Sequence, residues 1–477
     1  GNPKVGNIIQ VTTTANGVPT VLASDIQYHP FGPVKGFSFG NGLSYWMNLD
    51  QAYRPGLHSS GPRSKIASYD PAGNLKTLAD MNGKVQSFGY DALDELSSAA
   101  DTQAGSYGSL SYTYIKNGHR KTEVRNGVST TYSYLGSNRL FYTTARYWSY
   151  DAAGNVISDS TLGTLTYDGY GQLATVGATV YDYDALGRRV TKTVNDVTTS
   201  FHYAPPGELL YETGKRAYVY LNGMLLARVD NNSVYYYHTD ALGAPQLMTD
   251  ATGTTVWRGR YEPFGQVTVN EDPDGNGVLV KNNVRLPGQY FDSETGLYYN
   301  WFRYYDPKIG RYITAEPLGV VPGVASSATV PREITEYFRS LPLNEVLLNG
   351  LNHPYRYAYN NPLRYIDPNG LMGQGAGGGK SMQGPLRFGG GGAAPIEGPF
   401  GPVCGSGRGA TWIPDGPWKD ACRQHDDCYS RCGASRLQCD IDFLFDSGNV
   451  AYFIGARVGG RPPFQNAQNE SCCGQNK

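Results

Sequence analysis

The sequence predicts a chain of mainly β-structure that ends in a small α-helical, disulfide-rich domain. Three observations lead to this fold class. Only 17% of the 477 residues are charged, whereas glycine (61) and tyrosine (38) are abundant. Tyrosine favours pleated strands, and glycine supplies the positive φ angles of tight turns. A Tyr-Asp phrase also recurs along much of the chain, and all seven cysteines lie at or after Cys404.

Length and charge exclude several classes of protein. A chain of this length is expected to form about two to four domains. Its 40 Lys and Arg residues balance 41 Asp and Glu residues, which argues against a dedicated nucleic-acid binder or a basic membrane-surface protein. The sequence has no apolar run long enough for a transmembrane helix. Residues Gly1–Lys4 do not begin a signal peptide, so we expect the sequence to start inside a longer protein.

The Tyr-Asp phrase recurs from about residue 60 to residue 265 and continues with small residues and a glycine. Examples are Tyr69–Leu75, Tyr150–Val156, Tyr183–Arg189 and His238–Gly243. We expect the tyrosine to end a strand, the aspartate to cap the amides of the turn, and the glycine to adopt the left-handed conformation before the next strand. An ordinary hairpin turn explains one copy but not the series, which indicates a wrapped, solenoid-like sheet.

A second patterned region follows, in Arg285–Asn300, Arg303–Pro307, Gly310–Tyr312, Tyr357–Pro362 and Ile366–Leu371. The repeats resemble the YD or RHS repeats of bacterial Rhs proteins, toxin-complex C subunits and teneurins. The second region resembles the RHS core-associated domain. Together the resemblance covers roughly residues 60–371. It implies a hollow β-shell that encloses a C-terminal toxin, with the core-associated segment plugging one end.

This organisation predicts four segments. An insertion at 320–351 interrupts the second of them, and its residues Glu333–Arg339 have the pattern of a short amphipathic helix. The expected segments are a YD-repeat shell portion (1–284), an RHS core-associated domain (285–371), a glycine-rich linker (372–403) and a toxin domain (404–477).

The toxin domain holds a group of residues with catalytic potential. On a helix, Cys422, His425 and Cys428 share one face because they are three residues apart. A glycine-rich loop upstream offers carbonyl oxygens, and with a nearby carboxylate it would suit a hard cation such as Ca²⁺.

This C-x-x-H-D-x-C-Y string and its C-G-x-G loop resemble the secretory phospholipase A2 family. The resemblance implies that His425 is the general base and that Asp440 orients it. It also implies a calcium ion that polarises the ester carbonyl. The implied calcium ligands are the carbonyls of Val403, Gly405 and Gly407 and the carboxylate of Asp426, and the implied disulfides are Cys404–Cys422 and Cys428–Cys439.

Several departures from the phospholipase pattern leave alternatives open. Ala421 stands where the family has a second adjacent cysteine, Arg408 replaces a common glycine, and Asp442 competes with Asp440 for the orienting role. A zinc site and an inactive, calcium-binding relic are the alternatives to an active lipase. The partners of Cys432, Cys472 and Cys473 are not assigned, and Trp412, Ile413 and Trp418 suit either a membrane collar or a core.

The shell carries a second predicted activity, self-cleavage between Leu371 and Met372. In the Rhs family an Asp-Pro-x-Gly-Leu string marks self-cleavage by two acidic residues, and Asp367 begins such a string here. The second acid falls on Glu316, where the family has aspartate. Two carboxyl groups that share one proton would supply the acid and the base, although the extra methylene of glutamate moves its carboxyl. The alternative is that Asp367 only caps a Pro-Gly turn.

These observations together predict a secreted antibacterial Rhs-type toxin that hydrolyses the sn-2 ester of membrane phospholipids with calcium. The resemblance implies a cognate immunity protein and delivery by a secretion system, most plausibly type VI, and the balanced charge predicts no nucleic-acid partner. The disulfides suit delivery to the periplasm or membrane of a target cell. The alternative function is a YD-repeat cell-surface adhesion or carbohydrate-binding protein with an inactive disulfide-rich tail.

Overall fold

The computed structural model describes residues 7–316 and 353–371 and the backbone of 374–375, apart from positions 16, 31, 137, 205–206, 215 and 232. The chain divides into two compact units, residues 1–383 and 384–477, and all described residues belong to the first. The insertion 320–351, most of the linker and the whole domain 404–477 therefore lie outside the described residues. Among the residues that are described, no helix is long and apolar enough to cross a membrane.

The predicted β-structure is confirmed for the described residues, in which the strands of two large antiparallel sheets follow one another in sequence order. The first sheet contains β1 (Val11–Ala15), β2 (Val18–Tyr28), β3 (Val34–Phe39), β4 (Ser44–Leu49), β5 (Pro55–Ser60), β6 (Arg63–Tyr69), β7 (Leu75–Asp80), β8 (Val85–Tyr90), β9 (Leu96–Asp101), β10 (Ser109–Tyr114), β11 (Arg120–Arg125), β12 (Val128–Tyr134) and β13 (Leu140–Thr143). The second sheet contains β14 (Trp148–Tyr150), β15 (Val156–Asp159), β16 (Gly163–Tyr167), β17 (Leu173–Val176), β18 (Thr179–Tyr183), β19 (Arg189–Val194), β20 (Val197–Tyr203), β21 (Leu209–Glu212), β22 (Arg216–Leu221), β23 (Met224–Asp230), β24 (Ser233–Thr239), β25 (Pro245–Thr249), β26 (Thr255–Tyr261) and β27 (Val267–Asn270).

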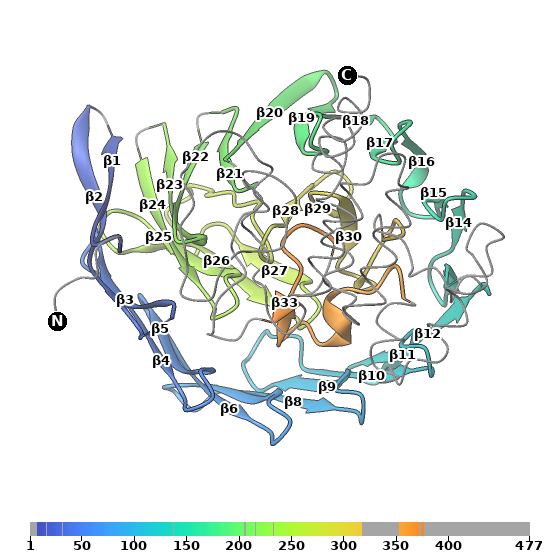
Figure 1. The fold of residues 1–477 in the computed structure, drawn as a ribbon, viewed down its shortest axis with the longest axis horizontal. Helices are drawn as coiled ribbons and strands as arrows, with labels where there is room; N and C mark the ends of the chain where they lie inside the picture. The colour runs from blue at the N-terminus through green and yellow to red at the C-terminus, as the bar shows by residue number, and fades with distance from the viewer. Residues whose placement is uncertain are drawn as a thin grey trace, which may run out of the picture. The chain divides into compact units, whose positions relative to one another are not determined.

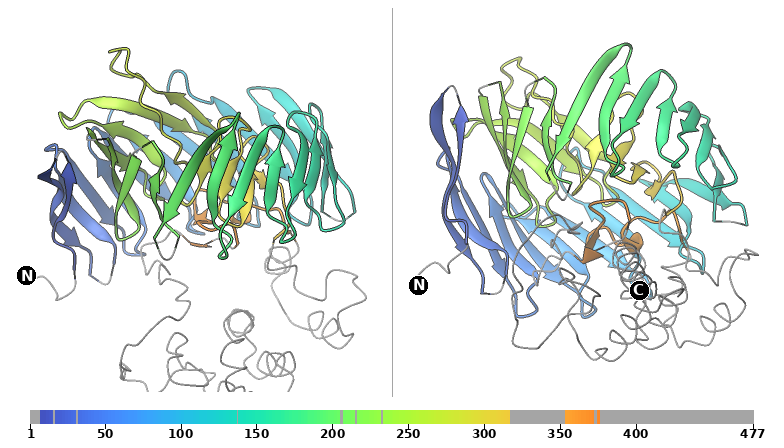
Figure 2. Two further views of the ribbon diagram at one scale, coloured as in Figure 1. Left: turned by 90° about the horizontal axis from the view of Figure 1, so that it is seen from above. Right: turned by 45° about the horizontal axis from the view of Figure 1, so that its top comes forward.

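Two smaller sheets follow, and we call residues 285–316 and 353–371 the plug. The plug contains β28 (Tyr290–Phe291), β29 (Tyr298–Asn300), β30 (Arg303–Asp306), β31 (Arg311–Tyr312), the 3₁₀ turn η1 (Ala358–Asn360) and β32 (Tyr365–Ile366). One further strand, β33 (Gln374–Gly375), follows the plug. Strands β28–β31 form one sheet, and β32 pairs with β33. The plug lies inside the curve that the two large sheets describe (Figures 1 and 2).

The turns of the repeat have the predicted chemistry. The carboxylate of Asp184 accepts the backbone N–H groups of Leu186 and Arg188, both at 2.9 Å. Gly187 has a φ of 76°, the left-handed conformation that only glycine adopts at low cost. Asp240 accepts the N–H groups two and four residues further on in the same way. These side chains close each hairpin locally, so the turn needs no distant partner.

The tyrosine of each repeat serves a second purpose that explains why it is not phenylalanine. Its hydroxyl donates to a backbone carbonyl of an earlier strand. The pairs are Tyr69 to Pro55, Tyr90 to Leu75, Tyr114 to Leu96, Tyr134 to Arg120, Tyr150 to Leu140, Tyr167 to Val156, Tyr183 to Leu173, Tyr203 to Arg189 and Tyr220 to Leu209. Burial raises the pKa of Tyr69 to about 12, so its hydroxyl keeps its proton. Each such bond contributes about 1 kcal/mol, and the series ties successive repeats together.

Hydrophobic packing joins the two large sheets to each other and holds the plug against them. Leu22 and Phe39 of the first sheet share a core cluster with Leu226 and Tyr236 of the second, whose strands lie side by side in Figure 1. The side chains of the β28–β31 sheet pack against β12–β20 in another cluster. The plug is therefore part of the core of the shell and not a separate domain packed on its surface.

Candidate self-cleavage site

The two acids predicted for self-cleavage lie in segments that follow plug strands. Asp367 directly follows β32, and Glu316 lies four residues after β31. Because β32 pairs with β33, the predicted bond between Leu371 and Met372 falls in the sequence that connects two paired strands. Met372 itself lies outside the described residues.

Asp367 is 1% exposed and its carboxylate is held from several sides. Its Oδ2 accepts hydrogen bonds from the hydroxyl of Tyr312 at 2.7 Å and from Nη2 of Arg303 at 3.1 Å. Its Oδ1 accepts the backbone N–H of Leu371 at 3.0 Å. The carboxylate therefore contacts the residue whose carbonyl belongs to the predicted bond.

Arg303 brings the two acids together. Its Nη2 contacts Oε2 of Glu316 at 2.7 Å as well as Oδ2 of Asp367. The guanidinium lies over the ring of Tyr312, 3.6 Å from its centroid, and Nε donates to the carbonyl of Gly370. A cation between two carboxylates balances part of their charge. The site is thus an Asp–Arg–Glu cluster and not a bare pair of acids that share a proton.

The backbone around Asp367 is packed so closely that two neighbouring positions require glycine. Gly370 has a φ of 71°, and a Cβ there would lie 2.4 Å from the carbonyl oxygen of Asn300. A Cβ on Gly288 would lie 1.8 Å from the carbonyl oxygen of Pro368. The amide of Asn300 donates to both the Tyr312 hydroxyl and the Asp367 carbonyl, each at 2.8 Å. No side chain larger than hydrogen fits at either glycine without displacing the backbone.

Arg303 and Tyr312 are functional candidates that the sequence reading did not single out. Both belong to strings that carried the family resemblance, and neither was given a role. The available signal was an arginine placed among tyrosines in a short strand, since a buried arginine requires anionic partners.

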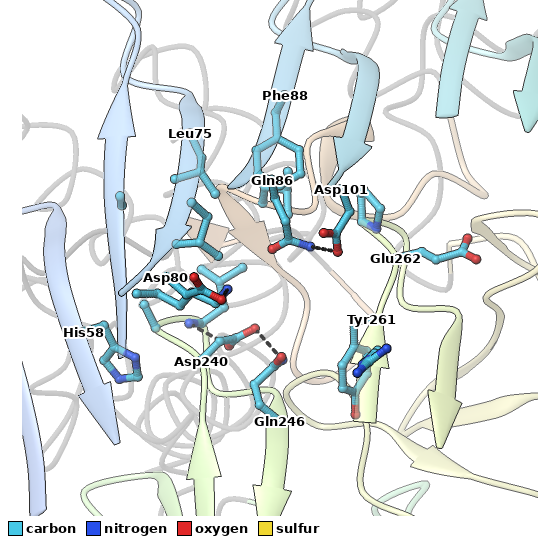
Figure 3. Close-up of a pocket in the computed structure, with 18 of the residues that line it drawn as sticks. His58, Leu75, Asp80, Gln86, Phe88, Asp101, Asp240, Gln246, Tyr261 and Glu262 are labelled. Carbon is cyan, nitrogen blue, oxygen red and sulfur yellow. Dashed lines mark hydrogen bonds and ion pairs between the residues drawn. The ribbon is translucent and has the colours of Figure 1, made fainter. Parts of the chain in front are cut away.

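A second candidate site is a cavity of about 1110 Å³ between the two large sheets, lined mainly by β5–β9 and β25–β27 (Figure 3). Asp240 and Asp101 line it and accept hydrogen bonds from the amides of Gln246 and Gln86, each at 3.1 Å. Neither ring nitrogen of His58 has a hydrogen-bond partner among the described residues. Burial lowers the pKa of His58 to about 3, so the ring is neutral. Within the described part of the chain, no group of three or more His, Cys, Asp or Glu residues is arranged to hold a metal.

A β-shell whose repeats are joined by tyrosine hydroxyl bonds, with a plug of short strands inside it, is typical of the class of YD-repeat shell proteins. Residues 67–362 match the sequence model of the teneurin YD-shell family, and the chain belongs to this family. Solved structures have the same fold. The TcdB2–TccC3 complex without its hypervariable C-terminal region covers 77% of this chain, with a TM-score of 0.60 and 20% identity. The match takes up 20% of that chain.

Several curated toxins are similar in sequence. Double-stranded DNA deaminase toxin A of Burkholderia cenocepacia is 28% identical over 356 residues, which are 64% of this chain and 21% of the toxin. The tRNA3(Ser)-specific nuclease WapA of Bacillus spizizenii is 32% identical over 63% of this chain and 14% of its own length. Toxin protein Tse5 of Pseudomonas aeruginosa is 32% identical over 29% of this chain and 8% of its own length. The chain spans about a fifth or less of the length of each of these three toxins.

These relatives contradict the predicted enzyme class, a calcium-dependent phospholipase A2. The enzymes among them are named as a DNA deaminase and tRNA nucleases, and these names also conflict with the expectation of no nucleic-acid partner. The phospholipase prediction rested on a few spaced cysteine, histidine and aspartate residues, and such spacing fixes no enzyme class by itself. The residues involved lie outside the described residues, and we assign them no role: His425, Asp440, Val403, Gly405, Gly407, Asp426, Cys404, Cys422, Cys428 and Cys439.

Proposed function

We propose that the chain belongs to a secreted Rhs-type antibacterial toxin whose YD shell encloses a C-terminal toxic segment. The observation that carries this proposal is the match of the shell to a DNA deaminase toxin, to tRNA nucleases and to Tse5. Such a toxin requires an immunity protein in the producing cell and a component that delivers it to the target cell. The toxin names of the relatives weigh against the alternative of an adhesion protein.

Expression in the periplasm or cytoplasm of a test bacterium examines this proposal. The full chain should stop growth in at least one compartment, whereas a chain that ends at Leu371 should not. Growth that is unaffected by the full chain in both compartments would contradict the toxin assignment.

We further propose that the shell cuts its own chain after Leu371. In this reaction a water molecule adds to the Leu371 carbonyl carbon while one carboxylate takes its proton. The second carboxyl group gives a proton to the Met372 nitrogen as the C–N bond breaks. Asp367 and Glu316 are the two acids, and their placement on Arg303 supports this pairing.

The competing reading is that Asp367 only caps a turn, and one contact favours it. Asp367 accepts the N–H of the fourth residue on, as Asp184 does in a shell turn. However, Asp367 also accepts hydrogen bonds from Tyr312 and Arg303, which lie on two neighbouring strands. A turn cap requires neither of these donors, so we favour the catalytic role.

Substitution of the two acids tests self-cleavage. The wild-type chain should give a fragment of about 12 kDa that begins at Met372, taking roughly 110 Da per residue. The Asp367→Asn and Glu316→Gln chains should remain intact, whereas Asp184→Asn, which changes a shell turn, should cleave like the wild type. A denaturing gel and N-terminal sequencing provide the measurement. An intact wild-type chain, or cleavage of Asp367→Asn at the wild-type rate, would refute the assignment.

A further inference from the structure

We infer that Tyr312 is a positioning residue for self-cleavage, which holds the Asp367 carboxylate so that Oδ1 is turned to the backbone of Leu371. The inference rests on the proposed self-cleavage. It assigns the reacting oxygen of Asp367 and identifies what keeps that oxygen in place.

The direction of the hydrogen bonds around Tyr312 is fixed by the chemistry of its neighbours. The Asn300 amide nitrogen, which can only donate, lies 2.8 Å from the Tyr312 hydroxyl oxygen. The single hydroxyl proton therefore points to Oδ2 of Asp367 at 2.7 Å. Burial raises the pKa of Tyr312 far above its usual value, with a further contribution from the nearby Asp367 charge, so this proton stays on the tyrosine.

The two oxygens of Asp367 consequently have different tasks. Oδ2 receives one donor from Tyr312 and one from Arg303, which fix the plane of the carboxylate. Oδ1 is turned to the backbone of Leu371. Two donors on the far oxygen leave the near oxygen as the one that can take a proton from a water at the Leu371 carbonyl.

The Tyr312→Phe variant separates the two contributions of this side chain. The ring supports the Arg303 guanidinium at 3.6 Å, and phenylalanine keeps that contact. The hydroxyl bond to Asp367 is lost. Other charged or titratable groups that face Asp367 are unchanged: Arg303, Glu316, Tyr357 and Tyr359.

Tyr305 offers a matched control. It pairs directly with Tyr312 across β30 and β31, and both side chains are 1% exposed or less. Its hydroxyl donates to the carbonyl of Phe264 at 2.6 Å and not to Asp367. Tyr305→Phe therefore removes an equally buried hydroxyl from the same sheet without changing the site.

The experiment follows cleavage of the full chain by pulse-labelled cell-free synthesis between pH 5 and pH 9. Tyr312→Phe should slow cleavage about ten- to a hundredfold, since a misplaced group costs rates of this order. Tyr305→Phe should keep the wild-type rate and profile. Equal melting temperatures of the two variants check that both fold.

Cleavage of Tyr312→Phe within twofold of the wild-type rate would overturn the inference. An equal slowing of both variants at every pH would also overturn it, because that result indicates a structural role alone. A wild-type chain that does not cleave refutes the proposed self-cleavage and this inference with it. If the wild type cleaves and Asp367→Asn does not, while Tyr312→Phe cleaves normally, only the role of Tyr312 fails.

Discussion

Asp292 provides the strongest test of how the plug is held in the shell. The side chains of Asp292 and of Arg189 on β19 are fully buried. Oδ2 and Oδ1 of Asp292 accept hydrogen bonds from the two terminal nitrogens of Arg189 at 2.5 and 3.1 Å. Nζ of Lys192 lies 3.0 Å from Oδ1. One plug carboxylate thus balances two cations of the shell.

The change Asp292→Asn removes this charge while keeping the shape of the side chain. Lys192 retains Glu294 at 2.9 Å, but Arg189 loses its bidentate anion in the core. The rings of Tyr299 and Phe201, at 4.4 and 4.8 Å from its guanidinium carbon, compensate in part. Removal of one partner from a buried ion pair costs about 3–5 kcal/mol. This loss is a large fraction of the stability of about 5–15 kcal/mol that is typical of a folded domain.

Urea unfolding followed by tryptophan fluorescence measures this effect, with Asp184→Asn as the control. Asp184 forms a partly exposed ion pair with Arg188 in a shell turn, and exposed pairs contribute about 0–1 kcal/mol. Asparagine at this position keeps an oxygen that can accept the N–H groups of the turn. We expect a clear fall of the unfolding midpoint for Asp292→Asn and little change for the control. Equal, small shifts in the two variants would refute the reasoning that the buried plug carboxylate is needed to balance the shell cations.

Two further predictions concern pH and backbone conformation. Burial lowers the pKa of His119 and His238 to about 3 and lowers that of His353 as well. These histidines take up protons near pH 6.5 in the unfolded chain but stay neutral in the folded chain. The free energy of unfolding should therefore fall by about 2 kcal/mol per histidine between pH 7 and pH 5. A urea unfolding midpoint that is the same at both pH values would contradict this. Gly370→Ala places a Cβ against the Asn300 carbonyl and should block cleavage, whereas Gly296→Ala, with open space around it, should cleave normally on the same gel.

The sequence was sufficient for the features that are local in the chain. The turn at Asp184 depends on N–H groups two and four residues away, so a short phrase determines it. The alternation of β10, in which the buried Leu110 and Tyr112 alternate with the exposed Ser109, Ser111 and Thr113, is equally local. Repetition of these signals predicts a long antiparallel sheet and its strand order.

The contacts that build the candidate site were beyond the reach of sequence reasoning. Arg303 and Asp367 are 64 residues apart, and Tyr312 and Asp367 are 55 apart. Nothing in a short string specifies which buried tyrosine donates to which carboxylate. The tilted contact between the rings of His119 and His353, with centroids 4.1 Å apart, likewise joins distant segments. The family pattern supplied the two acids because a motif preserves them as a string, but it gave no role to the arginine between them.

The positions of the buried charges indicate that the cleavage site forms only when the plug is in place. Asp306 of β30 forms an ion pair with Arg146 of the shell at 2.6 Å. The side-chain amide of Asn360 in η1 donates a hydrogen bond to Glu95 of the shell at 2.8 Å. These contacts hold β30 and the segment before β32, which carry Arg303 and Asp367. Arg303 contacts both acids, so displacement of β30 or of the segment before β32 from the shell would separate them. Self-cleavage should therefore follow folding of the shell. A variant that weakens the contact between plug and shell, such as Asp292→Asn, should slow cleavage although Asp292 lies outside the site.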